Sequence, residues 1–370
     1  MLLDKIAPLS EGQKAMLEAL RSKECDIVGL FGPTGTGKSL FSVAYGIDSI
    51  LKGDYKRFVI CKPIVDVVTS KEYTVAELRE AYYELATAYL KDILTSFVAW
   101  REIQELIESG KVVIADTHYL RGRTFDDSLI FLDDAQCIAP ESTLEVLMRV
   151  GRNSKFVLAG DPVFQKDPKV EKDGATVLRE VLLSEARACV VDLGLKDIVR
   201  PGAKRGIKLL FEVRMRKREL NEVEQKAMEV VKNHAPDADI VTIAELKPEK
   251  ERFEITSDHT PDLLIITKEG HLGRLIGRGG ERISKVQEEL DLKIRSMELT
   301  LDFRELVRVV HPVSWVFKHV KEADFAGPMI AFKVKKSAFG PFVGQRGFYA
   351  KFIDAVLRKL IGVGARAIEV

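Results

Sequence analysis

The sequence lacks any long apolar run. No stretch of its 370 residues approaches the roughly 18 uncharged apolar residues that a membrane-spanning helix needs. The first residues, MLLDKIAPLSEGQK, have no basic flank before an apolar core, so we expect neither export nor a membrane partner, and a cytoplasmic protein. With 46% hydrophobic and 31% charged residues, the composition is that of a globular chain of two or three domains.

Cysteine is scarce as well. The four cysteines, Cys25, Cys61, Cys137 and Cys189, lie far apart, with no Cys-x-x-Cys pair and no histidine at metal-ligand spacing. We therefore expect neither a zinc site nor a disulfide framework. The four thiols are expected to be small buried side chains.

Net charge is almost absent, because 57 Lys and Arg residues oppose 56 Asp and Glu residues and leave +1 at pH 7. This value alone gives no whole-chain argument for a polyanionic partner. The charge is unevenly spread, however. Residues 301–370 contain twelve basic and six acidic residues, a net +6, so residues 1–300 carry −5. A polyanion is expected to bind towards the C-terminal end.

The first 200 residues alternate short β-branched runs with longer helical patterns. Short apolar runs bounded by Gly, Asp or Pro are typical of strands buried on both faces of a parallel sheet. Thr74–Leu106 and Ser142–Val150 have the apolar spacing of covering helices. We predict an α/β domain over residues 1–205. Its candidate strands are Asp26–Phe31, Arg57–Cys61, Lys111–Ala115, Leu129–Leu132, Lys155–Ala159 and Ala188–Leu193.

A glycine-rich stretch between a predicted strand and a predicted helix fits the phosphate-binding pattern G-x-x-x-x-G-K-[ST]. Its glycines let backbone N–H groups point at phosphate oxygens, and the next helix adds partial positive charge. Lys38 would reach the β- and γ-phosphates of ATP, and Ser39 would hold Mg²⁺. An ordinary glycine-rich turn is the alternative. The expected nucleotide-binding residues are Gly32, Pro33, Thr34, Gly35, Thr36, Gly37, Lys38, Ser39 and Leu40.

Another predicted strand ends in two carboxylates. Leu129–Leu132 runs into Asp133 and Asp134, which is the form of a Walker B strand. Asp133 at the strand tip would hold the metal, and Asp134 would orient or deprotonate the attacking water. The alternative for Asp134 is a cap of the next helix.

A third strand end carries polar residues. Gly160 and Asp161 close the strand Lys155–Ala159, and Gln165 follows shortly after. Ligands of open α/β sheets bind at the carboxyl ends of strands, so these residues would sense the γ-phosphate. Read alone, Asp161-Pro162 is equally a turn.

Together these residues resemble the PhoH-like P-loop ATPases, which are related to superfamily 1 helicase motors. The resemblance covers about residues 8–201. Two departures are that Asp134 replaces a Glu, which bears on hydrolysis more than on nucleotide binding, and that one extra residue separates Asp161 from Gln165. The further motifs are Lys62-Pro63, where the family commonly has Arg-Pro; Tyr119-Leu120-Arg121-Gly122-Arg123-Thr124-Phe125; Asp133-Asp134-Ala135-Gln136, where Asp-Glu-Ala-Gln is usual; and Asn153-Ser154-Lys155.

The resemblance implies a RecA-like core that binds and hydrolyses ATP, coupled to RNA, in a homo-oligomer such as a hexameric ring. Gln13 sits where such motors carry an adenine-reading glutamine. A single P-loop core leaves one side of the γ-phosphate open, so a neighbouring copy could supply an arginine. Arg200, in a segment like the family's Asp-Val-Val-Arg, is the preferred residue and Arg149 the second. Either could instead be a solvated surface arginine.

The C-terminal part contains an internal repeat, in which Gly277 and Gly344 each begin a Gly-x-x-Gly loop before an amphipathic helix. The first copy resembles the KH signature Ile-Gly-x-x-Gly-x-x-Ile, whose loop lets the backbone approach single-stranded RNA. A glycine-rich turn between two helices is the alternative. The residues expected to contact RNA are Gly277, Arg278, Gly279, Gly280 and Arg282 in the first copy, and Gly344, Gln345, Arg346 and Gly347 in the second.

The element order predicts two type II KH domains, over residues 206–300 and 301–370. In the second, Trp315–Val320 and Met329–Lys335 are predicted to pair as a hairpin. The two together resemble the tandem KH region of the transcription factor NusA. The second copy could instead serve only packing.

The sequence thus predicts a RecA-like P-loop NTPase core with a parallel sheet, followed by two small α+β type II KH domains. We expect an RNA-associated ATPase that uses ATP and Mg²⁺ and binds single-stranded RNA, or single-stranded DNA. Phe348 and Tyr349 could stack on bases, although core burial is the commoner place for such rings. The main alternative is a nucleotide-gated RNA-binding switch or assembly factor that unwinds nothing. A P-loop kinase is less favoured.

Overall fold

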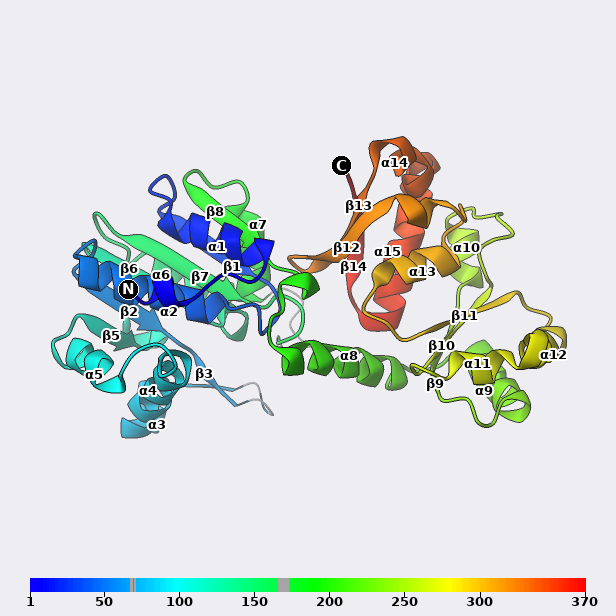
Figure 1. Cartoon of the computed structure of the whole chain (residues 1–370), viewed down its shortest axis with the longest axis horizontal. Coiled ribbons are helices and arrows are strands. Elements are labelled where there is room, and N and C mark those ends of the chain that lie inside the picture. Colours follow the sequence, from blue (N-terminus) through cyan, green and yellow to red (C-terminus); the bar gives the residue numbers. More distant parts are fainter. Residues whose placement is uncertain (67–68, 70, 166–172) are drawn as a thin grey trace. The chain divides into compact units, whose positions relative to one another are not determined.

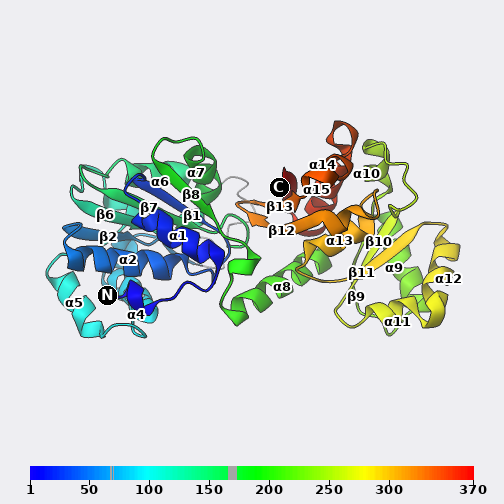
Figure 2. The same cartoon turned by 45° about the horizontal axis from the view of Figure 1, so that its top comes forward.

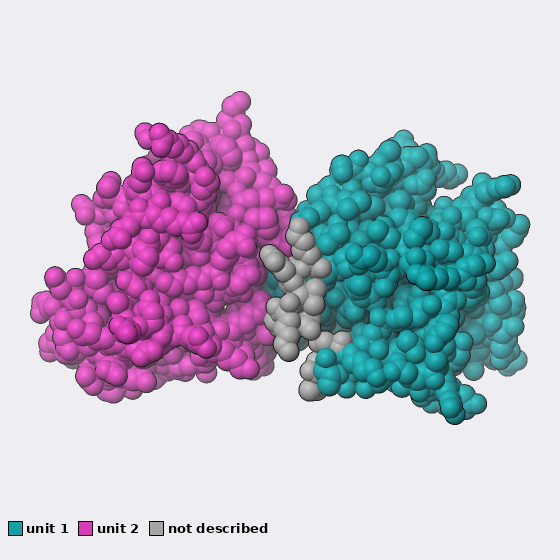
Figure 3. Space-filling model, turned by 180° about the vertical axis from the view of Figure 1, so that it is seen from behind, with its two compact units in different colours: residues 1–203 teal, residues 204–370 magenta. Residues whose placement is uncertain are grey.

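The computed structural model describes residues 1–66, 69, 71–165 and 173–370. The chain divides into two compact units, Met1–Ala203 and Lys204–Val370, which Figure 3 colours separately. Within the described residues, no helix is long and apolar enough to cross a membrane.

The first unit is built on a six-stranded sheet in the order β5-β2-β6-β7-β1-β8 (Figure 1). All of its strand pairs are parallel. Every residue of β6 and β7 is buried, which is why these strands are continuous apolar runs in the sequence. The six predicted strands are present and the predicted α/β class is confirmed. Their bounds are β1 Ile27–Phe31, β2 Arg57–Cys61, β5 Val112–Ala115, β6 Ser128–Leu132, β7 Lys155–Gly160 and β8 Ala188–Asp192.

Helices cover both faces of this sheet (Figure 2). Helices α1, α2, α4 and α5 bury their apolar side chains in one core cluster, and α6 and α7 bury theirs in the other. A short hairpin, β3 Ile64–Val65 with β4 Glu72–Tyr73, precedes α3. The helix bounds are α1 Glu11–Arg21, α2 Lys38–Lys52, α3 Val75–Leu78, α4 Glu80–Leu94, α5 Trp100–Glu108, α6 Pro140–Leu147 and α7 Gly174–Leu182.

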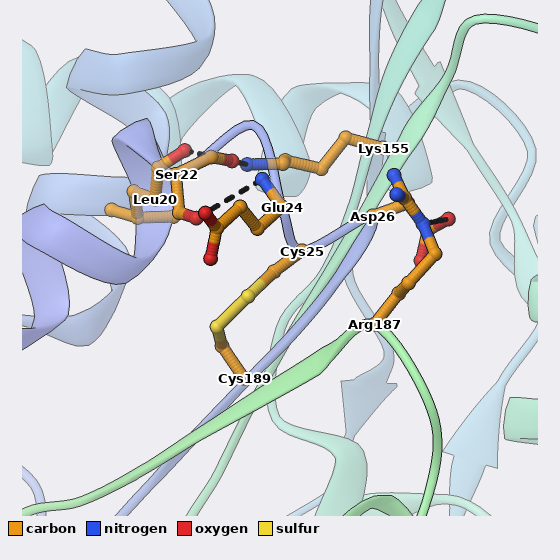
Figure 4. The surroundings of a disulfide bond; sticks show 8 residues. All are labelled: Leu20, Ser22, Glu24, Cys25, Asp26, Lys155, Arg187 and Cys189. Carbon is orange, nitrogen blue, oxygen red and sulfur yellow. Dashed lines mark hydrogen bonds and ion pairs between the residues drawn. A yellow bond between two sulfur atoms is a disulfide. The ribbon is translucent and has the colours of Figure 1, made fainter.

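One expectation about the cysteines is wrong. Cys25 and Cys189 form a disulfide with 5.8 Å between their Cα atoms (Figure 4), whereas Cys61 and Cys137 are free. The partners are 164 residues apart in sequence, and they meet because Cys25 lies just before β1 and β8 pairs with β1, Cys189 opposite Val28. Spacing along the chain cannot reveal a pair that strand order brings together.

The same region is tied by buried polar contacts. The ammonium of Lys155, on β7, donates to the backbone carbonyls of Leu20 and Ser22 at 2.8 and 2.6 Å (Figure 4). It thereby satisfies carbonyls at the C-terminal end of α1, where a helix lacks internal partners. Burial lowers the pKa of Lys155 to about 8.

The first half of the second unit is a small α+β module. Helix α8, Pro201–Arg216, leads into it. Its sheet has the order β11-β10-β9, with β9 and β10 antiparallel and β10 and β11 parallel. Such a mixed sheet, reached through a helix–loop–helix crossover, fits the type II KH arrangement. The bounds are α9 Glu222–His234, β9 Ile240–Glu245, α10 Lys247–Arg252, β10 Leu263–Thr267, α11 Leu272–Ile276, α12 Glu281–Leu290 and β11 Ile294–Glu298.

The second half repeats this arrangement. Its sheet has the order β12-β13-β14, again with one antiparallel and one parallel pair. The predicted fold, two small α+β modules of KH type after the P-loop core, is confirmed. The bounds are α13 Phe303–Val310, β12 Val320–Ala326, β13 Met329–Val334, α14 Lys336–Val343, α15 Phe348–Ile361 and β14 Gly364–Glu369.

The predicted strand Trp315–Val320 is wrong. Residues Val316–His319 form a 3₁₀ turn, and the strand that pairs with β13 begins only at Val320. Val316 and Val320 are both buried, and their four-residue spacing suits one face of a strand as well as one face of a helix, so the pattern does not reveal the turn.

The two modules contact each other within the second unit. The ammonium of Lys359, on α15, donates to the carbonyl oxygen of Glu245 at 2.6 Å and lies 3.3 Å from the buried carboxylate of Glu224. The rings of Phe253 and Phe348 lie 6.4 Å apart between centroids. Phe348 therefore packs between the modules instead of standing free for a base.

We predict that reduction of the Cys25–Cys189 disulfide lowers the free energy of unfolding by about 2–5 kcal/mol, because the crosslink closes a long loop in the unfolded chain. Thermal or urea unfolding with and without dithiothreitol measures the change. In the control variant, Cys25→Ala with Cys189→Ala, the reductant should have no effect. Equal stability of the reduced and oxidised native protein would contradict the prediction.

Candidate functional site

The predicted phosphate-binding loop lies between β1 and α2, as expected from its setting in the sequence. Gly35 and Gly37 have φ values of 83° and 92°, which side-chain-bearing residues rarely adopt. The Lys38 ammonium lies inside the loop, 2.7 Å from the carbonyl oxygen of Gly32 and 2.9 Å from that of Pro33. The loop is thus a glycine-lined concave backbone around a buried cation.

Two carboxylates face this cation. Burial lowers the pKa of Lys38 from its ordinary value, while the charges of Asp161 and Asp133 raise it. The three residues come from α2 and from the ends of β7 and β6. Opposite charges therefore converge at one edge of the sheet, and such a cluster around a group of shifted pKa marks a candidate functional site.

Asp133 is the centre of a hydrogen-bond cluster. Asp133 is 1% exposed, so its carboxylate is surrounded by protein groups. Its Oδ2 accepts from the Ser39 hydroxyl at 2.7 Å and also from the hydroxyl of Tyr89. Burial, followed by the Asp133 charge, raises the pKa of Tyr89 well above its ordinary value, so the phenol stays protonated and donates. A serine hydroxyl beside a carboxylate is a hard oxygen donor pair that fits Mg²⁺.

Asp134 lies next to a lysine. It has a left-handed backbone with φ 51°, and its side chain makes no capping bond to the following 3₁₀ turn, so the capping alternative is wrong. One carboxylate oxygen accepts from Gln136 Nε2 at 3.0 Å, and the other forms an ion pair with Lys62. Lys62 also lies 3.6 Å from Asp133 Oδ2.

Asp161 closes β7 with a turn. Its Oδ1 accepts the backbone N–H groups of Val163 and Phe164 at 3.0 and 2.9 Å, so the turn alternative describes its backbone. Its Oδ2 is buried without a hydrogen-bond partner among the described residues. Burial raises the pKa of Asp161, and the nearby Lys38 opposes that rise. Gln165 is exposed at the end of this described stretch.

Gln13 is buried against the phosphate-binding loop. Its amide nitrogen donates to the carbonyl oxygen of Thr36 at 3.0 Å, and its oxygen accepts the backbone N–H of Leu9 at 2.7 Å. A base-reading role would require an exchange of these bonds. The structure therefore places Gln13 as a brace between the loop and the start of α1.

The two candidate arginines differ in their surroundings. The guanidinium of Arg149, two residues beyond the end of α6, lies 3.2 Å from the carboxylate of Glu145 on that helix. Arg200 is exposed and lies beside the phosphate-binding loop of its own chain, where the backbone N–H of Val199 donates to the Gly35 carbonyl at 3.2 Å. A Cβ added to Gly35 would lie 3.3 Å from Arg200 Cβ.

The sequence patterns do not point to Tyr89, and they place Lys62 only within a family motif. Both lie at the carboxylate pair. A weak signal exists in the spacing of Tyr82 and Tyr89, seven residues apart and hence on one face of α4. Nothing in the sequence indicates that this face meets β6.

The two Gly-x-x-Gly loops have the same backbone shape. Gly277 and Gly344 have φ/ψ of 75°/176° and 72°/174°, and each loop ends in a left-handed glycine. At the third position Gly279 has φ 62° and Arg346 has φ 52°. Arg278, Gly279, Gln345 and Arg346 are exposed. The second loop keeps the geometry even where its residue is not glycine.

Some predicted loop residues are already engaged. The guanidinium of Arg282 pairs with the Asp237 carboxylate and donates to the Arg274 carbonyl at 2.8 Å. In the second loop, the ring of Tyr349 lies under Gly344 and 5.7 Å from that of His311. These two side chains support the backbone of the loops.

His311 is a buried histidine behind the second loop. One ring nitrogen accepts the Val313 N–H at 3.0 Å, so the other carries the proton and donates to the Phe342 carbonyl at 3.0 Å. Phe342 lies two residues before Gly344, the first residue of the loop. Burial lowers the pKa of His311 to about 4.

Sheet order and loop geometry define the class of the protein, a P-loop NTPase core followed by KH modules. The family model described as PhoH-like protein matches residues 5–212, and the one described as KH domain matches residues 237–310. The first match covers more than half of the chain. The chain belongs to the PhoH family. The likeness to the NusA tandem region stays a prediction.

Curated relatives match the first part of the chain. A PhoH-like protein of Bacillus subtilis (strain 168) is 32% identical over 193 residues, which are 51% of this chain and 58% of the relative. Protein PhoH of Escherichia coli (strain K12) is 26% identical over 196 residues, 52% of this chain and 54% of the relative. The matched part thus spans little more than half the length of these relatives.

Solved structures give weaker likenesses. The Pif1 helicase from Candida albicans is 13% identical, covers 71% of this chain and 64% of its own, and has a TM-score of 0.28. A score this low carries no argument. The fold assignment rests on strand order and on the family matches.

We predict that His311 makes the second unit less stable in acid. Its pKa is about 4 when folded against an ordinary value of 6.5, so stability is full above pH 6.5 and is lost as pH falls towards 4. The loss from this group is roughly 3 kcal/mol. Urea unfolding of the native protein and of His311→Gln at several pH values measures it. Equal losses in the two proteins would refute the assignment.

Proposed function

We propose that this protein is an ATPase that couples ATP binding and hydrolysis to the binding or remodelling of single-stranded RNA, in the manner of a helicase. The observation that carries the proposal is one chain that joins a P-loop, with the Ser39–Asp133 pair at its foot, to two exposed KH-type loops of matching backbone geometry. Membership of the PhoH family supports the first half of the proposal, and the KH family match supports the second.

At the nucleotide site, the backbone of residues 32–40 and the Lys38 ammonium would bind the phosphates. Mg²⁺, when bound, neutralises phosphate charge and polarises the γ-phosphoryl group. Ser39 and Asp133 would supply its oxygen ligands. Asp161, with one buried oxygen free, would sense the γ-phosphate together with Gly160 and Gln165.

Asp134 would accept a hydrogen bond from the attacking water and orient it. Arg200 would stabilise the charge that develops on the γ-phosphate. Its position beside Gly35 favours the P-loop of its own chain over that of a neighbour. Gln13 would hold the loop through Thr36 and meet the adenine only after its amide changes partner.

At the RNA site, the loops 277–280 and 344–347 would approach the sugar-phosphate backbone. Arg278 and Arg346 would supply positive charge from exposed positions, and the excess of basic residues in 301–370 supports that polarity. The same chemistry accepts single-stranded DNA. We further propose a cytoplasmic homo-oligomer, a ring such as a hexamer, as the resemblance to the PhoH-like ATPases implies.

A second candidate is a nucleotide-gated RNA-binding switch that separates no duplex. The observation that favours it is Asp134, which is one methylene shorter than the Glu usual in the family and is already engaged by Lys62 and Gln136. A strand-displacement assay discriminates, since a switch would bind RNA differently with ATP and ADP yet leave duplexes intact.

We predict that single-stranded RNA raises the ATPase turnover, that Lys38→Ala abolishes turnover, and that Arg278→Asp with Gly279→Asp removes only the RNA effect. The reversed loop charge would repel phosphate, and it leaves the residues of the P-loop, which belong to the other unit, unchanged. Turnover with and without single-stranded RNA or DNA is the measurement. Lys226→Asp, an exposed charge reversal on α9, is the matched control. Unchanged turnover and nucleotide affinity with RNA would end the coupling proposal.

We also predict that Arg200 acts within its own chain. Lys38→Ala and Arg200→Ala should each be inactive, and a mixture of the two should stay inactive, because neither chain holds both groups. If a neighbour supplies the arginine, a Lys38→Ala subunit would complete the site of an Arg200→Ala subunit. Recovery of turnover on mixing would therefore assign Arg200 to the neighbour's site.

A further inference from the structure

Lys62 lies across the two carboxylates of the nucleotide site. Its ammonium forms an ion pair with Asp134 and lies 3.6 Å from Asp133 Oδ2. The side chains of Lys62, Asp133 and Asp134 are 17%, 2% and 33% exposed, so the Lys62–Asp133 contact is shielded from water more than the Lys62–Asp134 pair is. An ion pair in such surroundings acts more strongly than one on the surface.

Helix α4 contacts Lys62 both at its backbone carbonyl and at its ammonium. The hydroxyl of Tyr82 donates to the Lys62 backbone carbonyl at 3.3 Å. Seven residues further along the same face of α4, the ring of Tyr89 lies 4.8 Å from the Lys62 ammonium. The Tyr89 hydroxyl donates to Asp133. The cation–π contact and the carboxylates together fix the position of the ammonium. This lysine is tethered, unlike a flexible surface lysine.

The oxygen that Lys62 approaches is the one that Ser39 uses. Asp133 Oδ2 accepts from Ser39 and Tyr89, and the Lys62 ammonium is the cation nearest to it in the described contacts. Any metal held by Ser39 and Asp133 would lie within a few ångströms of that ammonium. Two cations at such a distance repel each other strongly where water is scarce.

The same ammonium fixes Asp134. One Asp134 oxygen faces Lys62 and the other accepts from Gln136, so neither oxygen is free to turn. Gln136 in turn accepts the backbone N–H of Asp161 at 2.9 Å, which ties the carboxylate to the end of β7. Lys62, where the family commonly has Arg, and Asp134, where it usually has Glu, are therefore in direct contact.

We propose that Lys62 is the positioning residue of this carboxylate pair: its tethered ammonium sets the place of Asp134 and lowers the affinity of the Ser39–Asp133 pair for Mg²⁺. The inference rests on the proposed ATPase function and deepens it, because it names the group that sets the metal requirement. Lys62 and Asp134 act as one unit, with the charge of the first holding the carboxylate of the second.

The test is Lys62→Met, which keeps the apolar stem and removes the charge. We expect the affinity of the protein–ADP complex for Mg²⁺ to rise about tenfold, the size of one removed cation repulsion near the site. Calorimetric titration of Mg²⁺ into that complex measures it, and Mn²⁺ with electron paramagnetic resonance gives a second readout. Turnover should fall, because Asp134 is released.

Two matched variants control for charge and folding. Lys62→Arg keeps the charge and should retain the native Mg²⁺ affinity. Lys56→Met removes a lysine that pairs with Asp127 on the exposed surface, and it should change nothing. Lys62→Gln, with urea unfolding of every variant, separates loss of charge from loss of fold.

A double-mutant cycle tests the unit. Once Asp134→Asn has lowered turnover, adding Lys62→Met should lower it little further. An unchanged Mg²⁺ affinity in Lys62→Met and Lys62→Gln would overturn this inference. Weaker binding of ADP to these variants in the absence of metal would also overturn it, because Lys62 would then be a phosphate ligand. If the native protein binds no Mg²⁺–nucleotide at all, the proposed function fails with it.

Discussion

The parallel pairing of β1 with its neighbours is the constraint on which the nucleotide site depends. Because β6, β7 and β1 run in one direction, their carboxyl ends lie at one edge of the sheet. The backbone N–H of Gly32 donates to the carbonyl of Gly160 at 3.0 Å, and that of Asp133 donates to the carbonyl of Cys61 at 3.0 Å. The loop lysine, the buried carboxylates and the tethered Lys62 follow from this alignment.

The sequence predicts this part well where a site residue directly follows a buried strand. Asp133 is identified that way and Ser39 by the phosphate-binding pattern, and the structure joins them by a 2.7 Å hydrogen bond. Tyr89 is not identified, because it comes from a helix whose approach to Asp133, just after β6, leaves no local trace in the sequence. The Cys25–Cys189 disulfide is missed for the same physical reason. A contact between distant segments depends on the order of the strands in the sheet, and the spacing of residues along the chain does not predict that order.

In the second unit, repetition made the prediction strong. Two copies of one pattern predict two copies of one fold, and both sheets have the same mixture of parallel and antiparallel pairs. The error at Trp315–Val320 arises at a single 3₁₀ turn. Val316 and Val320 are both buried, and over so few residues this pattern does not distinguish a turn from a strand. Contacts between the modules, such as Lys359 with Glu224, had no sequence signal.

The two loops place an exposed arginine at different positions of the same backbone. A left-handed backbone costs an arginine of order 1 kcal/mol more than a glycine, yet Arg346 has φ 52° where the first loop has Gly279. In the first loop, the second position is Arg278 and the third is glycine; in the second loop, they are Gln345 and Arg346. Each loop therefore presents one exposed cation between its glycines. In the proposed contact with RNA, each loop would bring one cation to phosphate, and in the second loop a strained residue would supply it.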